Sequence, residues 1–247
     1  MNYFGFVAHK RRKKFWIKII SVAIVAILFV VLCVTFLNAK RGKEFAMQYF
    51  AVGVCATDKK QIANNLSSTL QTKGASGLVV TQDDFFVLCF LYDKKSEAKQ
   101  IEKGLLEQGY DAKIETIKIE KMCKSANKYI KNNENILNCK LFFAEMFKSL
   151  KTKVAQFDGG KIKESKIFSD LKQFERRATL LAVCVDEKNK IDECFVCGLE
   201  NICMHINEFL KNASLASQFS AGLKTLCFEV LFEWQRLVAN VNASIEN

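Results

Sequence analysis

The pattern of apolar residues between positions 48 and 120 occurs as two consecutive copies. A shift of 35 positions superimposes Asp58-Lys59-Lys60 on Asp93-Lys94-Lys95, and it places Gly74 on Gly109, where the end of a helix most often needs a positive φ. Each copy is typical of an apolar strand, a D-K-K turn that begins a helix, a glycine and a second strand. The expected elements are strand Tyr49 to Cys55, helix Lys59 to Lys73, strand Ala75 to Thr81, strand Phe85 to Tyr92, helix Ser96 to Gln108 and strand Ala112 to Ile119. Two copies are too few for a solenoid, so we expect one ferredoxin-like βαββαβ domain.

From Lys121 onward, apolar residues recur at alternating gaps of three and four, which is the spacing of packed helices. Four such sets occur: Ile136 to Leu150, Ile167 to Val185, Leu199 to Ala213 and Leu223 to Val241. The breaks fall at Asp158-Gly159-Gly160, at Asp186 to Glu193 and around Ser214 to Gly222. The pattern predicts an antiparallel four-helix bundle. In the alternative, one helix pairs with a second copy of the chain and forms a homodimer.

An uncharged apolar stretch from Ile19 to Leu37 precedes the duplication and is long enough to cross about 30 Å of hydrocarbon. Six Lys and Arg residues and no acidic residue lie before it, whereas the basic residues after it are partly offset by Glu44. This asymmetry favours a single transmembrane helix with the N-terminus inside the cytoplasm and the remaining domains outside. A cleaved signal peptide is the alternative, but its apolar region would span only about 7 to 15 residues.

The expected organisation is therefore a basic segment and transmembrane helix over residues 1–39, a spacer over 40–47, the α+β sheet domain over 48–120 and the helical bundle over 121–247. The formal net charge of +11 is concentrated before the sheet domain. From Glu44 to Glu120, nine Lys face eleven acidic residues, and from Lys121 to the end, nineteen basic residues face fifteen acidic ones. Neither part is basic enough to indicate a nucleic-acid partner.

The sequence contains no Walker loop, no H-E-x-x-H, no G-x-S-x-G and no dinucleotide glycine fingerprint. His205 is the only histidine beyond the predicted membrane span. We therefore expect neither an enzyme nor a bound cofactor.

Cysteines at positions 194, 197 and 203, together with His205, have the composition of a Cys3His zinc site. However, Cys203 and His205 are two apart on a predicted helix, where their side chains diverge by about 200°. We expect no metal, with a disulfide or redox pair at Cys194 and Cys197 as the alternative. Cys55, Cys89, Cys139 and Cys227 fall on strands or on apolar helix faces and are typical of small buried hydrophobic residues.

The segment from Gln48 to Ile119 resembles the sporulation-related repeat (SPOR) family, in which a strand V-Q-V-G-S-F precedes a helix A-x-x-L-x-x-x-L and a glycine. The matching residues here are Phe50-Ala51-Val52-Gly53-Val54-Cys55, then Ala63, Leu66, Leu70 and Gly74, with a second copy at Phe86 to Tyr92, Ala98, Leu105 and Gly109. The resemblance implies a membrane-tethered bacterial envelope protein. It also implies that the sheet face left uncovered by the helices binds septal peptidoglycan glycan strands.

Strand alternation predicts that Phe85, Val87 and Cys89 point to this open face, together with Ala51 and Gly53. Phe86, Leu88 and Phe90 should turn toward the helices. Phe85, Val87, Ala51 and Gly53 are thus the candidate glycan-binding residues. The chain departs from the family where Ala51 replaces Gln and Val54 replaces Ser, so the polar groups expected to hold sugar are missing. An apolar face of this kind could bind protein or be covered by the helical bundle.

Two functions therefore remain open. The first is a bitopic protein of the bacterial cytoplasmic membrane whose SPOR-like module binds peptidoglycan in cell division, sporulation or wall maintenance. The second is a non-enzymatic scaffold whose sheet domain and bundle bind other envelope or division proteins and never contact glycan.

Overall fold

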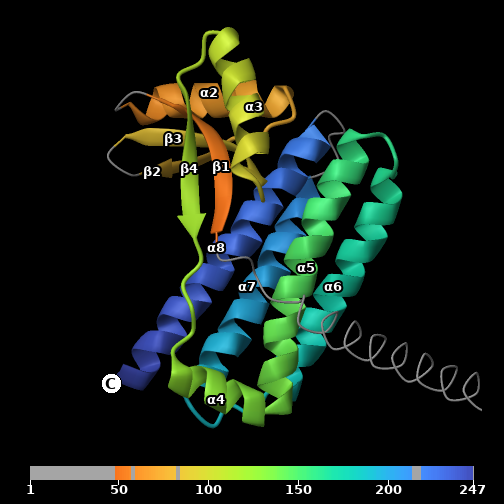
Figure 1. The fold of residues 1–247 in the computed structure, drawn as a ribbon. Coiled ribbons are helices and arrows are strands. Elements are labelled where there is room, and N and C mark those ends of the chain that lie inside the picture. The colour runs from red at the N-terminus through yellow and green to blue at the C-terminus, as the bar shows by residue number, and fades with distance from the viewer. Residues whose placement is uncertain (1–47, 57–58, 82–83, 213–217, 247) are drawn as a thin grey trace, which may run out of the picture. The chain divides into compact units, whose positions relative to one another are not determined.

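The computed structural model describes residues 48–56, 59–81, 84–212 and 218–246 (Figure 1). They belong to one compact unit, Phe45–Asn247. The predicted transmembrane helix and the spacer that follows it lie outside the described residues. Among the helices that the structure does describe, none combines the length and the apolar character that a membrane crossing requires.

The duplicated segment forms a four-stranded antiparallel sheet with two helices, in the order strand, helix, strand, strand, helix, strand (Figure 1). Its elements are β1 (Gln48–Cys55), α2 (Lys60–Thr72), β2 (Leu78–Thr81), β3 (Phe85–Tyr92), α3 (Lys95–Glu107) and β4 (Ala112–Lys118). The strand order across the sheet is β2-β3-β1-β4. Gly74 and Gly109 have φ values of 80° and 84°, so both helices end as the sequence predicts.

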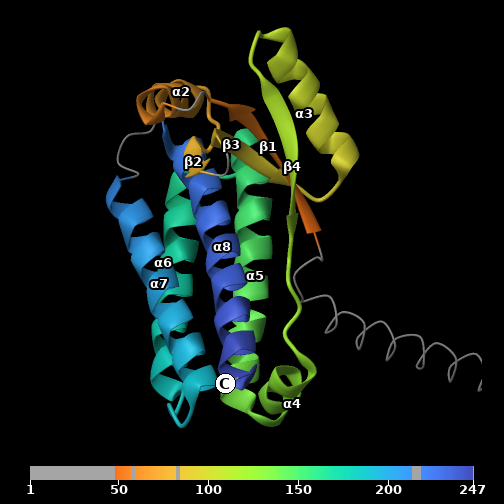
Figure 2. The ribbon, with the colours of Figure 1, turned by 90° about the vertical axis from the view of Figure 1, so that its left-hand side faces the viewer.

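The C-terminal region is helical, as predicted. It consists of α4 (Lys124–Asn132), α5 (Glu134–Asp158), α6 (Glu164–Cys184), α7 (Lys190–Asn212) and α8 (Phe219–Glu246). The four long helices pack side by side, and α5 contacts both α6 and α8 (Figure 2). The short helix α4 was not predicted. Helix α7 begins within the expected break from Asp186 to Glu193, and Cys194 lies in its first turns.

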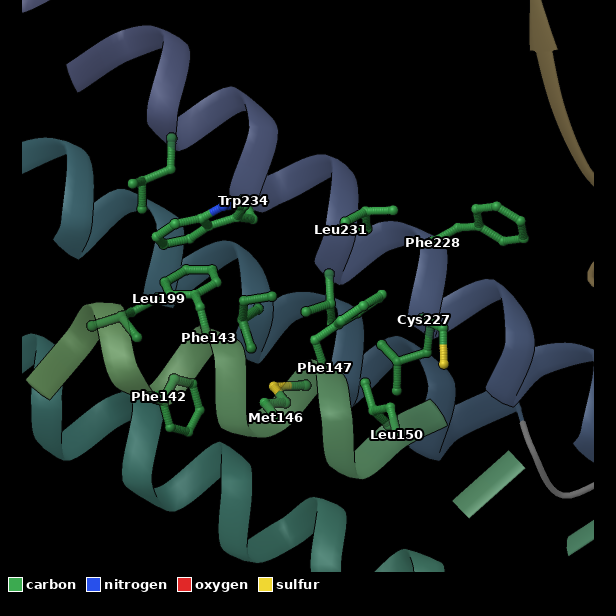
Figure 3. Close-up of a cluster of buried hydrophobic side chains, with 14 of the residues drawn as sticks. Phe142, Phe143, Met146, Phe147, Leu150, Leu199, Cys227, Phe228, Leu231 and Trp234 are labelled. Carbon is green, nitrogen blue, oxygen red and sulfur yellow. The ribbon is translucent and has the colours of Figure 1, made fainter. Parts of the chain in front are cut away.

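Aromatic and aliphatic side chains from the long helices fill their common interior (Figure 3). Phe142 and Phe143 on α5 are fully buried, and the Phe143 ring lies 5.6 Å from the ring of Trp234 on α8. The same cluster continues without interruption into the sheet, where it includes Ala51 and Leu88. The sheet and the helices therefore share one core.

A β-bulge interrupts the pairing of β1 with β3. Ala51 pairs with Leu91 and Val52 with Phe90, but Gly53 pairs with Leu88, so Cys89 is the extra residue on β3. A bulge of one residue reverses the faces of all side chains beyond it, because side chains alternate along a strand.

This bulge overturns the predicted facing of β3. With an unbroken ladder, Val87 would share a face with Ala51, as the alternation predicts. Instead, Val87 and Phe85 pack with residues of α2, including Ala63 and Leu70. Phe86 and Leu88, which were expected to face α2 and α3, pack against the C-terminal helices. The prediction for β1 was correct in one respect, since Ala51 lies on the face away from α2 and α3.

Candidate functional site

The four predicted glycan-binding residues are not brought together on an accessible surface. Ala51 and Val87 have no exposed area, and they lie on opposite faces of the sheet. Gly53 is buried, and a Cβ at this position would lie 2.5 Å from the Phe86 ring. Phe85 is half-buried against the helices. Among the described residues, Phe85 thus lies on the sheet face that packs against α2 and not on the predicted open face.

The face that the SPOR resemblance assigns to glycan is occupied by side chains of α5 and α8. The Tyr49 ring on β1 packs edge-on against the Phe147 ring on α5, with 5.1 Å between ring centroids. Their exposed fractions are 4% and 2%, so the contact excludes water. In Figures 1 and 2 the sheet lies between α2 and α3 on one side and the C-terminal helices on the other.

Hydrogen bonds and ion pairs surround this apolar contact. Near the N-terminal end of α8, Lys224 Nζ donates to the carbonyl of Gly74 at 2.6 Å and pairs with Asp158 at 2.7 Å. The neighbouring Thr225 hydroxyl donates to the carbonyl of the fully buried Ser76 at 3.0 Å. These contacts fix the loop between α2 and β2 on helix α8.

Two further contacts hold β1 and β4. Lys151 on α5 pairs with Asp93, and its Nζ lies 5.0 Å from the centroid of the Tyr49 ring, which favours a cation–π contact. Farther along α8, the Gln235 amide donates to the carbonyl of Lys118 at 2.9 Å. The sheet is thus attached to the helices by a water-excluding core with a polar rim.

A hollow of about 200 Å³ lies where α2 meets α7 and α8. It is lined by Gln71, His205, Glu208, Phe209, Asn212, Gln218, Ala221, Gly222, Thr225 and Glu229. The Nδ1 atom of His205 is buried and lies 3.5 Å from Glu229 Oε2, which is too long for a good hydrogen bond. Burial raises the pKa of Glu229; the His205 imidazole opposes this shift and Glu208 adds to it.

The chemistry of this hollow is limited. Its residues offer carboxylate and amide groups that could accept hydrogen bonds from a small cation or an alcohol. The lining hydroxyl, that of Thr225, donates within the fold to the carbonyls of Ser76 and Ala221. Sequence reasoning missed this hollow because Gln71 and His205 meet only through tertiary packing, and no local spacing marks it.

The cysteine and histidine constellation does not converge on one point. The Cys203 thiol faces α6, where it donates to the Glu175 carbonyl at 3.7 Å, whereas His205 faces Glu229 on α8. Cys194 and Cys197 lie about one turn apart on α7. Among the described residues, no group of three His, Cys, Asp or Glu side chains is placed to hold a metal ion.

The cysteines predicted to act as small hydrophobic residues are largely buried as expected. Cys139 and Cys227 have no exposed area, and Cys89 is 6% exposed. Burial raises the pKa of the Cys89 thiol to about 11, with partial opposition from Lys224. Thiols of this kind are protonated at neutral pH and react slowly.

Comparison of the chain with protein-family models, with curated proteins and with solved structures finds no match. The functional argument therefore depends on the geometry described above.

Proposed function

We propose that the protein is a non-enzymatic scaffold of the bacterial envelope, anchored in the cytoplasmic membrane by its N-terminal helix. Its ferredoxin-like sheet domain and four-helix bundle act as one rigid body that binds other membrane-complex proteins. The observation that carries this proposal is the burial of Tyr49 and Ala51 against α5 and α8. A sheet face that is filled by the protein's own helices has no room for a glycan strand.

The packing favours a scaffold in which the sheet stays docked on the helices over one in which the sheet face opens. The sheet contributes to the same hydrophobic cluster as the helices, so exposing its face would require separating a core rather than moving a loop. Interfaces between independently moving domains are generally more polar than this one.

A peptidoglycan-binding SPOR-like module is the second candidate. The order of strands and helices and the positive φ values of Gly74 and Gly109 favour it, because the family repeat ends each helix with a glycine. Glycan would then have to bind a surface other than the sheet face. The two candidates differ in one measurable property, the affinity for sacculi.

Co-sedimentation of purified residues 45–247 with peptidoglycan sacculi separates the candidates. Sacculi with intact stem peptides and sacculi stripped of them should both leave the protein in the supernatant. The assay should include about 0.5 M salt, which screens nonspecific attraction between surface lysines and acidic wall polymers. Saturable binding to stripped sacculi at this salt concentration would refute the scaffold proposal and support the SPOR-like module.

Photo-crosslinking in cells tests the scaffold directly. A photoreactive residue at Val183 on α6, which is 79% exposed, should yield a protein adduct of discrete mass, identifiable as the same envelope protein in replicates. The matched control is Leu171 on the same helix, which is fully buried and should yield no adduct. A series of exposed positions that all failed to yield adducts would count against a protein-binding role.

A further inference from the structure

Helix α4 presents a lysine stripe to solvent. Successive residues of a helix are rotated by about 100°, so Lys124, Lys128 and Lys131 lie within about 60° of one another. Ala126 and Ile130, at 0% and 1% exposure, occupy the opposite face and pack into the shared core. All three lysines are exposed, and the helix contains no acidic residue.

The lysine charges are not neutralised within the fold. In the part of the chain that the structure describes, no carboxylate pairs with Lys124, Lys128 or Lys131 within 4 Å. Lys121, just before the helix, is exposed and likewise has no such partner. By contrast, Lys94 at the N-cap of α3 pairs with Glu97, and Lys103 on α3 pairs with Glu107.

Helix α4 is held so that this stripe cannot turn inward. The Tyr129 hydroxyl donates to both carboxylate oxygens of the fully buried Asp192, at 2.8 and 3.0 Å. The Asn242 side chain on α8 accepts from the backbone N–H of Cys123 at 2.8 Å and donates to the carbonyl of Lys121 at 3.1 Å. The orientation of the stripe is therefore a fixed property of the fold.

The start of α4 and the point where the chain enters the described unit are both held by helix α8. Gln48, the first residue of β1, pairs with Lys118 at the end of β4, and the Lys118 carbonyl binds Gln235. Asn242, which binds the backbone of Lys121 and Cys123 just before α4, lies seven residues farther along α8, which corresponds to about 10 Å at about 1.5 Å per residue. The predicted span ends at Leu37, eleven residues before Gln48, so the connecting chain can reach at most about 40 Å.

We propose that this lysine stripe binds the anionic surface of the lipid bilayer and orients the scaffold on the membrane. The inference rests on the proposed N-terminal anchor, which would keep the stripe within reach of lipid phosphates. Clusters of lysines near a membrane are attracted by anionic lipids over about one Debye length. Because the apolar face of α4 is used inside the protein, the contact is electrostatic and does not insert into the acyl chains.

Flotation of purified residues 45–247 with vesicles tests the stripe without the anchor. This stretch has its own hydrophobic core, as described above. It should bind vesicles of phosphatidylcholine containing about one third phosphatidylglycerol at low salt, and it should not bind pure phosphatidylcholine. Changing Lys124, Lys128 and Lys131 to Gln should lower the partition coefficient on the order of 100-fold, since each lysine contributes a factor of roughly five.

The matched control changes Lys95, Lys99 and Lys103 on α3 to Gln, which removes the same net charge from another exposed helix. This control should lower binding only a few-fold. Equal losses in the two triple variants, or no binding to anionic vesicles, would overturn the inference. So would competition by soluble polyphosphate at the same phosphate concentration, since it would indicate a general polyanion site.

Failure of the anchor is detected separately. Full-length protein that leaves the membrane fraction in high salt would contradict the transmembrane helix, even if the isolated fragment floats with anionic vesicles. If the full-length protein stays in the membrane fraction but the fragment does not bind anionic vesicles, only the proposed lipid binding by the lysine stripe is contradicted.

Discussion

Replacing Tyr49 and Phe147 with leucine, singly and together, measures how strongly the sheet is coupled to the helices. The two rings meet at an interplanar angle of 71°, in the edge-on geometry that aromatic pairs prefer. Tyr49 belongs to β1 and Phe147 to α5, so the pair spans the face that would have to be open for glycan binding. A measured coupling energy therefore reports directly on whether that face is closed.

The expected magnitudes follow from burial and geometry. Leucine keeps much of the apolar area, so each single change should lower the free energy of unfolding by about 1–2 kcal/mol. The edge-on pair contributes about 0.5–1.5 kcal/mol beyond area burial. The double variant should therefore be less destabilised than the sum of the two single variants by about that amount. A domain of ordinary stability, about 5–15 kcal/mol, would remain folded in all cases.

Urea unfolding of residues 45–247 provides the measurement. Trp234 is the only tryptophan in this stretch, and its fluorescence reports on the helical core next to Phe143. As a control, Tyr49→Leu can be combined with Phe168→Leu, since Phe168 packs against Phe219 and Phe209 rather than against the sheet. Independent sites should add within about 0.3–0.5 kcal/mol.

Additive behaviour of Tyr49 and Phe147, equal to that of the control pair, would refute the reasoning. It would mean that the sheet is not docked on the helices in solution. A Tyr49→Leu variant whose Trp234 transition is unchanged would lead to the same conclusion, and the sheet face would again be a candidate glycan surface.

Three further predictions concern single positions and the chain's topology. Gly53→Ala should lower the free energy of unfolding by about 1–3 kcal/mol in the same assay, because its Cβ would meet the Phe86 ring. As a control, Gly104→Ala on α3, with open space around it, should be neutral or stabilising. Equal effects of the two substitutions would contradict the packing at Gly53. Because the pKa of Glu229 is raised in the folded state, that state keeps a proton that the unfolded chain loses above about pH 4.5, and this contribution lowers stability as pH rises. In urea unfolding, the free energy of unfolding of Glu229→Gln should therefore rise relative to that of the wild type as the pH increases from about 4.5. A difference between the two proteins that does not change with pH would contradict the raised pKa of Glu229. A reporter that is active only in the cytoplasm should be silent when fused after Asn247, and activity would place the C-terminus inside.

Local sequence signals were sufficient for the elements and their order. The offset of 35 residues predicted two strand-helix-strand copies, and the bounds of β3 agree with the prediction at both ends. Apolar periodicity also located the four long helices, because burial of one helix face requires apolar residues every three or four positions. Gly74 and Gly109 were identified correctly because a positive φ is a local requirement that few other residues meet.

The same signals gave no information on what lies against each face. The β-bulge at Cys89 reverses the facing of Phe85 and Val87. The sequence of β3 does not predict the bulge, because the whole strand is apolar. The short helix α4 was missed because nine residues hold too few apolar positions to show a period. Whether an apolar sheet face binds a ligand or another part of the chain is decided by tertiary contacts such as that between Tyr49 and Phe147. Sequence periodicity specifies that a face must be buried, and only the tertiary structure selects the partner that buries it.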